Sequence, residues 1–470
     1  MSKYFKCSTN KNPLTYTCGE KIVFTILAKD NCIDAPCDYI HWKLMGDDGK
    51  VLEGLGSSKS GNPLILETTL DKPGFVYLTC TSVNNCGNPD NVFDVLDAGA
   101  GADVEKIEYQ DTVPDDFDEY WADIEKKVAD FDYEVLMNEP VTTGVPAGFK
   151  CYELRISTPE GRPASGFVSI PEKEGKYPIY ITFNGYAVAG SAAVYKTDHI
   201  SVHFNAHGFE NNLKQIELKQ KYYHELSKNK NGFSYGFDPK ENASNMTTYW
   251  RNMMIRNLIG LKYIKSLPMW DQKNITAFGG SQAALQATTL AAHDSDVTFL
   301  EINIPWFCNL NAENNGFVAG WRPKFAEGLR YFDTVAQAKK VKCPVKIFAK
   351  LGDTVCRASS VMALYNNFKV NKKIEFLQSG NHGYNPPERK SFYLWNDPEN
   401  SNDLITGKYK HFKGGEYELL YTAYASEGTT DLQVVYRSLI DNKIWVRPAN
   451  MWNDLLFNGE KYVKRFEIIK

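Results

Sequence analysis

Ser281 lies in the run Phe278-Gly279-Gly280-Ser281-Gln282-Ala283-Ala284, whose pattern is typical of a catalytic serine. The mostly apolar residues 274–278 predict a short buried strand before it, and the Ala- and Leu-rich residues 284–293 predict a helix after it. A strand, a tight turn with a central serine and a helix form a nucleophile elbow, whose strained turn exposes the hydroxyl at the strand end. Gly279 and Ala283 fill the two small positions that this turn needs, the second of which is usually glycine. An ordinary turn is the alternative for so short a pattern.

A serine nucleophile needs a base that takes its proton. Three histidines follow Ser281 in the chain, namely His293, His382 and His411. His293 belongs to the predicted elbow helix and His411 to a separate C-terminal segment. Because His382 directly follows a predicted strand that ends near residue 378, we assign it as the base.

The base in turn needs an acid that orients it. Asp353 follows the predicted strand 345–349 directly, and its alternative role is the N-cap of a helix over residues 359–368. Ser, acid and His in this order, each after a strand, is the arrangement of the α/β-hydrolases. We therefore predict a catalytic triad of Ser281, Asp353 and His382.

Two backbone N–H groups should hold the oxyanion that forms when such a serine attacks an ester. Gln282, the residue after the nucleophile, supplies the first, and Tyr186, in a loop after the predicted strand 177–183, supplies the second. The candidate residues of the substrate pocket are Asn184, His207 and Trp306. A core position is the alternative for Trp306.

His199, His203 and His207 are spaced by four residues, which on a helix would suggest a metal site. Residues 200–205 instead read as a strand followed by a turn at residues 206–208. A strand puts neither the ligand spacing nor a fourth ligand in place, so we predict no metal. The serine mechanism needs no cofactor, and we predict none.

The predicted elements divide the chain into three parts. Residues 1–105 predict an all-β, sandwich-like domain, in which the run 98–102 reads as a linker or loop. Residues 106–400 alternate helices with short apolar strands, which predicts a mostly parallel sheet covered on both faces. Residues 403–470 predict a small β domain. In the first domain, Tyr39 and Trp42 are core residues or, alternatively, a sugar-stacking face.

Composition narrows the class of protein. The chain has 470 residues, 43% of them hydrophobic and 23% charged, and a net charge of −4 without a long basic run. These values are typical of a globular protein that binds no nucleic acid. Neither an export signal nor a membrane span is evident, so we expect a cytoplasmic protein; a sequence that has lost its signal would be periplasmic or secreted.

The chain has ten cysteines, whose redox state we infer from the expected compartment. They are scattered along the chain, and in the N-terminal domain Cys32 could approach Cys37, and Cys80 could approach Cys86. Without an export signal we expect reduced thiols.

With these residues in place, the chain from about residue 113 to 387 resembles the acetyl xylan esterase and cephalosporin C deacetylase family of α/β-hydrolases. The resemblance is carried by four motifs: the serine run 279–284, the Asp-Phe-Asp-x-aromatic-Trp helix start at 116–121, the loop Asn184-Gly185-Tyr186, and the series Asp353, Cys356 and Ser359. It implies an α/β-hydrolase fold flanked by the N-terminal sandwich-like domain and the C-terminal β domain. The C-terminal segment resembles a small bacterial β domain of unknown function.

The chain departs from the family pattern at several positions that line the expected pocket. Ala283 and Ala284 replace two glycines, Asn184 replaces a histidine, and His382 is followed by Gly383 rather than by an acidic residue. The triad and the oxyanion donors are retained, so the resemblance implies intact ester chemistry with its own acyl and leaving-group preference.

The first hypothesis is a serine carboxylesterase that removes acetyl groups from small acetylated sugars or xylo-oligosaccharides. The alternatives are an esterase for another acyl group, a peptidase, or a non-catalytic homologue that binds glycans. The expected partner is the small carbohydrate substrate, and we expect binding to neither nucleic acid nor membrane. Whether the chain forms a homo-oligomer is left open by the sequence.

Overall fold

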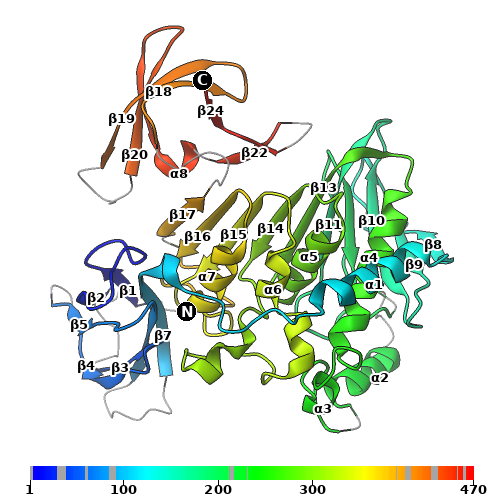
Figure 1. Cartoon of the computed structure of the whole chain (residues 1–470), viewed down its shortest axis with the longest axis horizontal. Coiled ribbons are helices and arrows are strands. Elements are labelled where there is room, and N and C mark those ends of the chain that lie inside the picture. Colours follow the sequence, from blue (N-terminus) through cyan, green and yellow to red (C-terminus); the bar gives the residue numbers. More distant parts are fainter. Residues whose placement is uncertain are drawn as a thin grey trace.

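The computed structural model describes residues 4–28, 39–58, 62–83, 92–209, 211, 216–229, 231–387, 389–396, 404–424, 432–452, 454–458 and 462–469. These residues form a large central sheet with helices, a smaller β unit at the N-terminal end and another at the C-terminal end (Figure 1). Three separate clusters of buried hydrophobic side chains lie in these parts.

Ten strands form the central sheet, in the order β17-β16-β15-β14-β13-β11-β12-β10-β9-β8. The strands from β12 to β16 are parallel, and the strands at both edges are antiparallel. Their bounds are β8 Val135–Pro140, β9 Phe149–Ile156, β10 Ala164–Pro171, β11 Tyr177–Phe183, β12 Ile200–Phe204, β13 Trp270–Gly280, β14 Phe299–Asn303, β15 Val345–Lys350, β16 Lys372–Leu377 and β17 Ser391–Asn396.

Five helices pack side by side in one layer against this sheet, in the order α1, α4, α5, α6, α7. Their bounds are α1 Phe117–Asp130, α4 Tyr249–Lys265, α5 Gln282–His293, α6 Thr334–Ala338 and α7 Ala358–Asn367. The other helices between residues 104 and 331 are α2 Ile216–Ser227, α3 Pro239–Asn242, η1 Val104–Lys106, η2 Leu310–Asn315 and η3 Glu327–Tyr331. In the part of the chain that the structure describes, no helix has the length and apolar composition that a membrane crossing requires.

The helical layer covers one face of the sheet, which corrects the expectation of helices on both faces. From β12 to β16 the chain advances in one direction along the sheet, and right-handed crossovers place all the connecting helices on the same side. The connection in the other direction, from β11 to β12, is a coil. On the opposite face, alternate residues of β13 to β16 stay partly exposed, among them Phe278, Glu301, Lys346 and Phe348.

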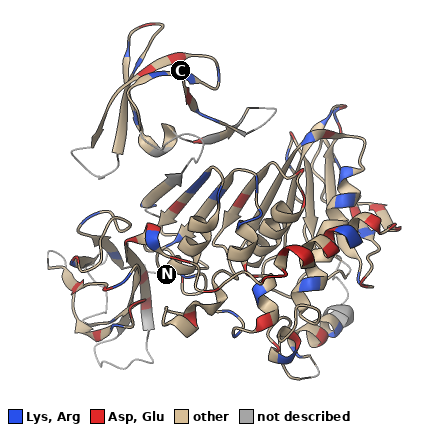
Figure 2. Cartoon of the chain, viewed as in Figure 1, with Lys and Arg blue, Asp and Glu red and all other residues tan. Residues whose placement is uncertain are grey.

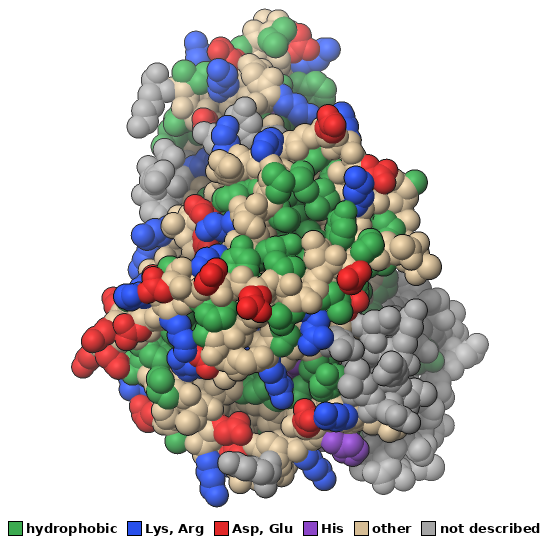
Figure 3. Space-filling view, turned by 90° about the vertical axis from the view of Figure 1, so that its right-hand side faces the viewer, with side chains coloured by type: hydrophobic (Ala, Val, Ile, Leu, Met, Phe, Trp, Pro, Cys, Tyr) green, Lys and Arg blue, Asp and Glu red, His purple; other side chains and the backbone are tan. Residues whose placement is uncertain are grey.

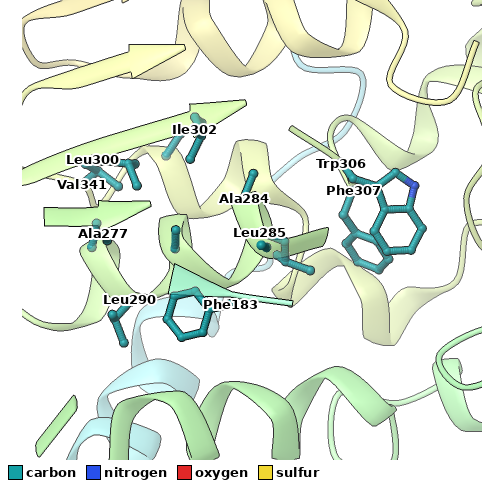
Figure 4. Close-up of a cluster of buried hydrophobic side chains, with 14 of the residues drawn as sticks. Phe183, Ala277, Ala284, Leu285, Leu290, Leu300, Ile302, Trp306, Phe307 and Val341 are labelled. Carbon is teal, nitrogen blue, oxygen red and sulfur yellow. The ribbon is translucent and has the colours of Figure 1, made fainter. Parts of the chain in front are cut away.

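The core between sheet and helices is built around the elbow strand β13 and helix α5 (Figure 4). Ala277 on β13, and Ala284, Leu285 and Leu290 on α5, pack with residues of the neighbouring strands. The small alanines let α5 approach the sheet closely. Because residues 274–277 of β13 and most of α5 are buried, the turn between them is held at a defined position.

Two facing sheets form the N-terminal unit, in the orders β1-β2-β5 and β4-β3-β6-β7. Their apolar side chains meet in one core, as in a β-sandwich. The strands are β1 Phe5–Thr9, β2 Ile22–Ala28, β3 Tyr39–Gly46, β4 Val51–Gly56, β5 Leu64–Thr68, β6 Gly74–Val83 and β7 Val92–Ala102. Trp42 packs against this core, which agrees with the expectation of a core residue rather than a sugar-stacking face.

The run 98–102 is part of strand β7, not a linker or loop, so that expectation was wrong. Ala98, Ala100 and Ala102 point into the sandwich core, whereas Gly99 and Gly101 face the other way. A Cβ on Gly99 would lie 2.4 Å from the carbonyl oxygen of Leu351 in the central domain. The alternation of Ala and Gly, which suggests a flexible segment in the sequence, therefore belongs to a strand with one face in each of two packed units.

A five-stranded sheet, in the order β21-β20-β19-β18-β24, forms the C-terminal unit. Its core holds Tyr436, Trp452 and Phe466, with the last two rings stacked at 3.8 Å. The elements are β18 Gly407–His411, β19 Glu416–Tyr424, β20 Leu432–Ser438, β21 Ile444–Pro448, α8 Ala449–Trp452, β22 Leu455–Phe457, β23 Tyr462–Lys464 and β24 Phe466–Ile468.

Charges of both signs are mixed over the whole cartoon, as the small net charge suggests (Figure 2). On the side that carries β8, hydrophobic side chains gather near the middle of the surface, with acidic and basic side chains around them (Figure 3). Val135 and Leu136 of β8 are among the exposed apolar residues of the central domain.

Seven cysteines lie in the described residues, and all are free thiols. Burial raises the pKa of Cys7 and of Cys343 to about 12. The possible approach of Cys32 to Cys37 and of Cys80 to Cys86 involves positions 32, 37 and 86, which lie outside the described residues.

Candidate active site

Ser281 stands between the end of β13 and the start of α5, in a strained backbone conformation with φ 55° and ψ −123°. A non-glycine residue rarely adopts such angles unless the surrounding structure enforces them. Gly279 has no room for a side chain, because a Cβ there would lie 2.0 Å from the carbonyl oxygen of Ala283. Ala283 itself is buried in the core. The turn therefore requires glycine at position 279 and accepts alanine at position 283.

The imidazole of His382 joins Ser281 to Asp353. Its Nδ1 donates to Asp353 Oδ2 at 3.0 Å, and its Nε2 lies 3.1 Å from Ser281 Oγ. Because a carboxylate only accepts hydrogen bonds, the Nδ1 carries the proton of the neutral ring and Nε2 is left as the acceptor for the serine hydroxyl. This is the geometry in which a histidine can act as a general base.

Asp353 is fully buried, and its second oxygen is also satisfied. Oδ1 accepts the backbone N–H groups of Val355 and Cys356, each at 2.8 Å. The alternative role as a helix N-cap does not apply, because α7 begins at Ala358 with Arg357 at its N-cap position. The carboxylate is therefore fixed in orientation by the turn that follows β15.

A lysine holds the turn that carries His382. Lys350, the last residue of β15, donates from Nζ to the carbonyl of Asn381 at 2.8 Å and to that of Tyr384 at 3.2 Å. Burial lowers the pKa of Lys350, and the charge of Asp353 opposes this effect. Lys350 thus connects the loop of His382 to the strand that leads into the loop of Asp353.

Within the described ranges, the metal-ligating side chains whose ligand atoms converge are Asp353, Cys356 and His382. Both carboxylate oxygens of Asp353 already accept hydrogen bonds from protein groups. Burial, aided by the charge of Asp353, raises the pKa of the Cys356 thiol well above its ordinary value. Since a metal prefers a thiolate, this donor set fits a hydrogen-bonded triad better than a metal site.

The loop after β11 lies against the elbow, as expected for the second oxyanion donor. A Cβ on Gly185 would lie 4.0 Å from the carbonyl oxygen of Gly280. The Gln282 side chain donates to the carbonyls of Asn184 and Gly185, each at 3.4 Å. In a trans peptide the C=O and the following N–H point in opposite directions, so this bond turns the Tyr186 N–H away from α5. Among the described residues, neither that N–H nor the Gln282 N–H has a hydrogen-bond partner.

A cavity of about 570 Å³ opens in front of Ser281 and His382. Asn184 lines it, and its amide donates to the carbonyls of Ala189 and Gly190 at 3.0 and 3.2 Å, which shapes the loop. The lining residues are Phe183, Asn184, Gly185, Tyr186, Ala187, Ala189, Gly190, Ala192, His203, Ser281, Trp321, Val355 and His382.

Two of the expected pocket residues lie behind this lining. His207 is buried, where its Nε2 donates to the Ala187 carbonyl at 2.8 Å and its Nδ1 lies 2.6 Å from Tyr249 Oη. Trp306 is also buried, and its Nε1 donates to the Trp321 carbonyl at 2.5 Å. His207 thus supports Ala187 and Trp306 supports Trp321, and neither of the two lines the cavity itself.

The strand and turn expected for residues 200–208 are confirmed. His203 lines the cavity while His199 bonds Asp198 at 2.7 Å, so the three histidines spaced by four do not converge.

Sequence reasoning missed several cavity residues, above all Trp321 and Val355. Val355 had a usable signal, because it lies two residues after Asp353 in the same loop. Trp321 had none, since it follows no strand and belongs to no motif.

The parallel sheet, the serine elbow after β13 and the loops after β15 and β16 define an α/β-hydrolase. Within that class the chain belongs to the acetyl xylan esterase (AXE1) family, whose model matches residues 102–313 and 323–397. Residues 407–468 match a family of proteins of unknown function (DUF1653). The protein is therefore a carboxylic ester hydrolase with an additional C-terminal unit.

A curated relative is the acetyl esterase Axe7A of Xylanibacter ruminicola, which is 23% identical over 72% of this chain and 77% of its own length. Among solved structures, acetyl xylan esterase 1 from Thermoanaerobacterium sp. JW/SL YS485 has 19% identity and a TM-score of 0.49, covering 61% of this chain and 93% of its own. The acetyl xylan esterase from Paenibacillus sp. R4 has 16% identity and a TM-score of 0.48, covering 60% and 94%.

Proposed function

We propose that this chain removes acetyl groups from acetylated sugars or xylo-oligosaccharides, with Ser281, His382 and Asp353 as its catalytic triad. The observation that carries the proposal is the single imidazole of His382 within 3.1 Å of Ser281 Oγ and 3.0 Å of a buried carboxylate. Membership of the acetyl xylan esterase family supports the acetyl ester as substrate.

In the first half of the reaction, Ser281 Oγ attacks the ester carbonyl while His382 Nε2 takes the serine proton. The resulting imidazolium stays bound to Asp353, whose negative charge stabilises it. His382 then gives the proton to the departing sugar oxygen, the bond between that oxygen and the acyl carbon breaks, and an acetyl-serine remains.

In the second half, water attacks the acetyl-serine, and His382 takes one of its protons. The same proton returns to Ser281 Oγ as the acyl bond breaks, which releases acetate. In both halves the carbonyl oxygen becomes negative, and the N–H groups of Tyr186 and Gln282 stabilise it. Protein groups and water supply every proton and nucleophile of this route.

The test is acetate release from ethyl acetate and from xylose tetraacetate, with the natural chain and with Ser281→Ala. The expected loss in the variant is on the order of 10⁴-fold or more in kcat, as for other triads. Ser82→Ala is the matched control, because Ser82 is a buried serine of the N-terminal sheet that does not line the cavity. It should retain activity on both esters.

Other outcomes would favour the alternatives. A folded chain that releases acetate from neither ester, but hydrolyses longer acyl esters or peptides, would be an esterase for another acyl group or a peptidase. A chain without any hydrolysis that still binds xylo-oligosaccharides would be a glycan-binding homologue. Undiminished release by Ser281→Ala would contradict the assignment of the nucleophile.

A further inference from the structure

One wall of the cavity comes from a segment that the family match leaves out. The match covers residues 102–313 and 323–397, so residues 314–322 lie between its two parts. Trp321 belongs to this segment and lines the cavity together with Ser281 and His382. This part of the cavity wall therefore lies outside the residues that match the family model.

Trp321 presents an exposed aromatic surface on a rigid support. It is 45% exposed although three aromatic rings contact it. Trp306 stacks against it with ring centroids 5.4 Å apart, and Tyr186 and Phe237 approach it at 4.8 and 4.9 Å. An exposed indole held in this way is available to a ligand with little loss of side-chain entropy on binding.

The N-terminal sandwich holds the segment on one side. Asp47, in the turn after β3, is buried and accepts the Val318 N–H at 2.9 Å through one oxygen and the Phe75 N–H at 2.8 Å through the other. Lys72 places its Nζ 4.3 Å from the centre of the Phe317 ring. Asp47 thus connects the sheet of the sandwich directly to the segment that carries Trp321.

The loop of the catalytic acid holds the segment on the other side. A Cβ on Gly320 would lie 2.0 Å from the carbonyl oxygen of Val355, so the two backbones are in direct contact. Arg357 donates from Nε to the Ala319 carbonyl at 3.2 Å. Trp321 is therefore positioned relative to the triad through the Asp353 loop.

We propose that Trp321 is the platform on which the sugar ring of the ester stacks, and that the N-terminal domain presents it to the catalytic domain. The inference rests on the proposed function and names the part of the site that recognises the alcohol. An acetyl group has only two carbons and fills a small part of a cavity of about 570 Å³. The C–H groups on one face of a pyranose ring pack well on the electron-rich face of an indole.

The experiment compares kcat/KM for xylose tetraacetate and for ethyl acetate, which has no ring, in Trp321→Ala and Trp321→Phe. We expect the ratio of kcat/KM for xylose tetraacetate to kcat/KM for ethyl acetate to fall about tenfold in Trp321→Ala, mainly because KM of the sugar ester rises. Trp321→Phe keeps an aromatic face and should recover most of the ratio. Trp445→Ala, at a tryptophan of the C-terminal domain that is 50% exposed, is the matched control and should leave the ratio as it is.

Presentation by the N-terminal domain is tested with Asp47→Ala, and with Lys72→Ala as a surface variant that should fold normally. Both should lower the same ratio, the first more strongly.

An unchanged ratio in Trp321→Ala, whether kcat/KM stays the same or falls equally on both esters, would overturn the proposal that Trp321 is the sugar platform. An unchanged ratio in folded Asp47→Ala and in Lys72→Ala would overturn the role of the N-terminal domain. Failure of the proposed function is a separate result, since the natural chain would then release acetate from neither ester.

Discussion

At the scale of single residues, the site combines a strained backbone at Ser281 with a carboxylate at Asp353 whose two oxygens both accept hydrogen bonds. Ser281 is held at φ 55° by its buried neighbours. Asp353 accepts three hydrogen bonds, of which one comes from the base. The acid therefore has one permitted orientation, and it selects the tautomer of His382 that leaves Nε2 free for the serine proton.

Asp353→Asn tests this selection. An asparagine can present its amide NH₂ toward Nδ1, which favours the tautomer with the proton on Nε2 and removes the base. We expect kcat to fall on the order of 10⁴-fold with little change in the melting temperature.

Asp333→Asn is the matched control for that variant. Asp333 is also buried and accepts the N–H groups of Asn309, Leu310 and Val335, but it has no contact with His382. This control should lower the melting temperature and retain most of kcat. Equal losses of kcat in the two variants would contradict a special role of Asp353.

At the scale of elements, the loop after β11 depends on a buried histidine outside the cavity. His207 Nε2 donates to the Ala187 carbonyl, next to Tyr186, so Nδ1 of the neutral ring accepts from the Tyr249 hydroxyl. Burial, together with the charges of Arg256 and Arg162, lowers the pKa of His207 to about 3, against the opposing effect of the hydrogen bond to the Ala187 carbonyl. The folded protein thus keeps this ring neutral.

The sign of the resulting pH dependence follows from proton binding. Between about pH 3 and pH 6.5, the ordinary value, the unfolded chain binds a proton at His207 and the folded chain does not. The free energy of unfolding therefore rises with pH across this window and decreases as the pH falls through it. One such group changes it by about 1.4 kcal/mol per pH unit at most.

His207→Gln removes this titration while it keeps one donor and one acceptor. We expect urea unfolding of the variant to depend less steeply on pH between 4 and 6 than unfolding of the natural chain. His224→Gln is the control, because His224 lies near the end of α2 and has no contact with the cavity loop. Equal slopes for the natural chain and His207→Gln would show that His207 is already protonated in the folded state.

At the scale of the whole molecule, the N-terminal sandwich contacts both loops that carry Asp353 and His382, the proposed acid and base. Asp97 on β7 accepts from the Asn381 amide at 3.1 Å, directly beside His382. A Cβ on Gly352, next to Asp353, would lie 2.6 Å from the Asp97 carbonyl oxygen. The Gln378 amide makes two hydrogen bonds to the backbone of Gly99, at 2.9 and 3.2 Å.

Asp97→Ala should therefore displace the His382 loop and lower kcat, by roughly tenfold to a hundredfold, with a smaller change in KM. Asp97→Asn keeps an acceptor for Asn381 and should recover most of kcat. Thr79→Val removes the other hydrogen bond of Asp97, which Thr79 donates at 3.0 Å within the sandwich, and serves as the control. A loss of kcat in Thr79→Val as large as in Asp97→Ala would indicate general destabilisation instead.

Much of the site could be predicted from local patterns. Ser281, Asp353 and His382 each follow an apolar strand, and chain order distinguishes them from the other serines, acids and histidines. The same holds for Tyr186, because parallel strands bring their carboxyl ends to one edge of the sheet. These inferences needed only the period of the strands and the chemistry of the side chains.

Other features depend on contacts between distant parts of the chain. The run 98–102 reads as a linker because Ala and Gly are weak strand formers, yet β7 needs small residues where two units pack closely. His207 and Trp306 were expected in the pocket, but whether a residue at a strand end reaches a cavity or lies behind it depends on the loops above it. The helices cover one face of the sheet because the reverse connection contains no helix.

The sequence by itself determined the class of protein and the three residues that we propose as its triad, because strand periodicity and functional groups are local properties. Only the tertiary structure decided that Asp97 supports the histidine loop and that Asp47 holds the segment of Trp321, since these pairs are separated by 284 and 271 positions. Such pairs are chosen by the packing of one domain on another, which no local pattern records.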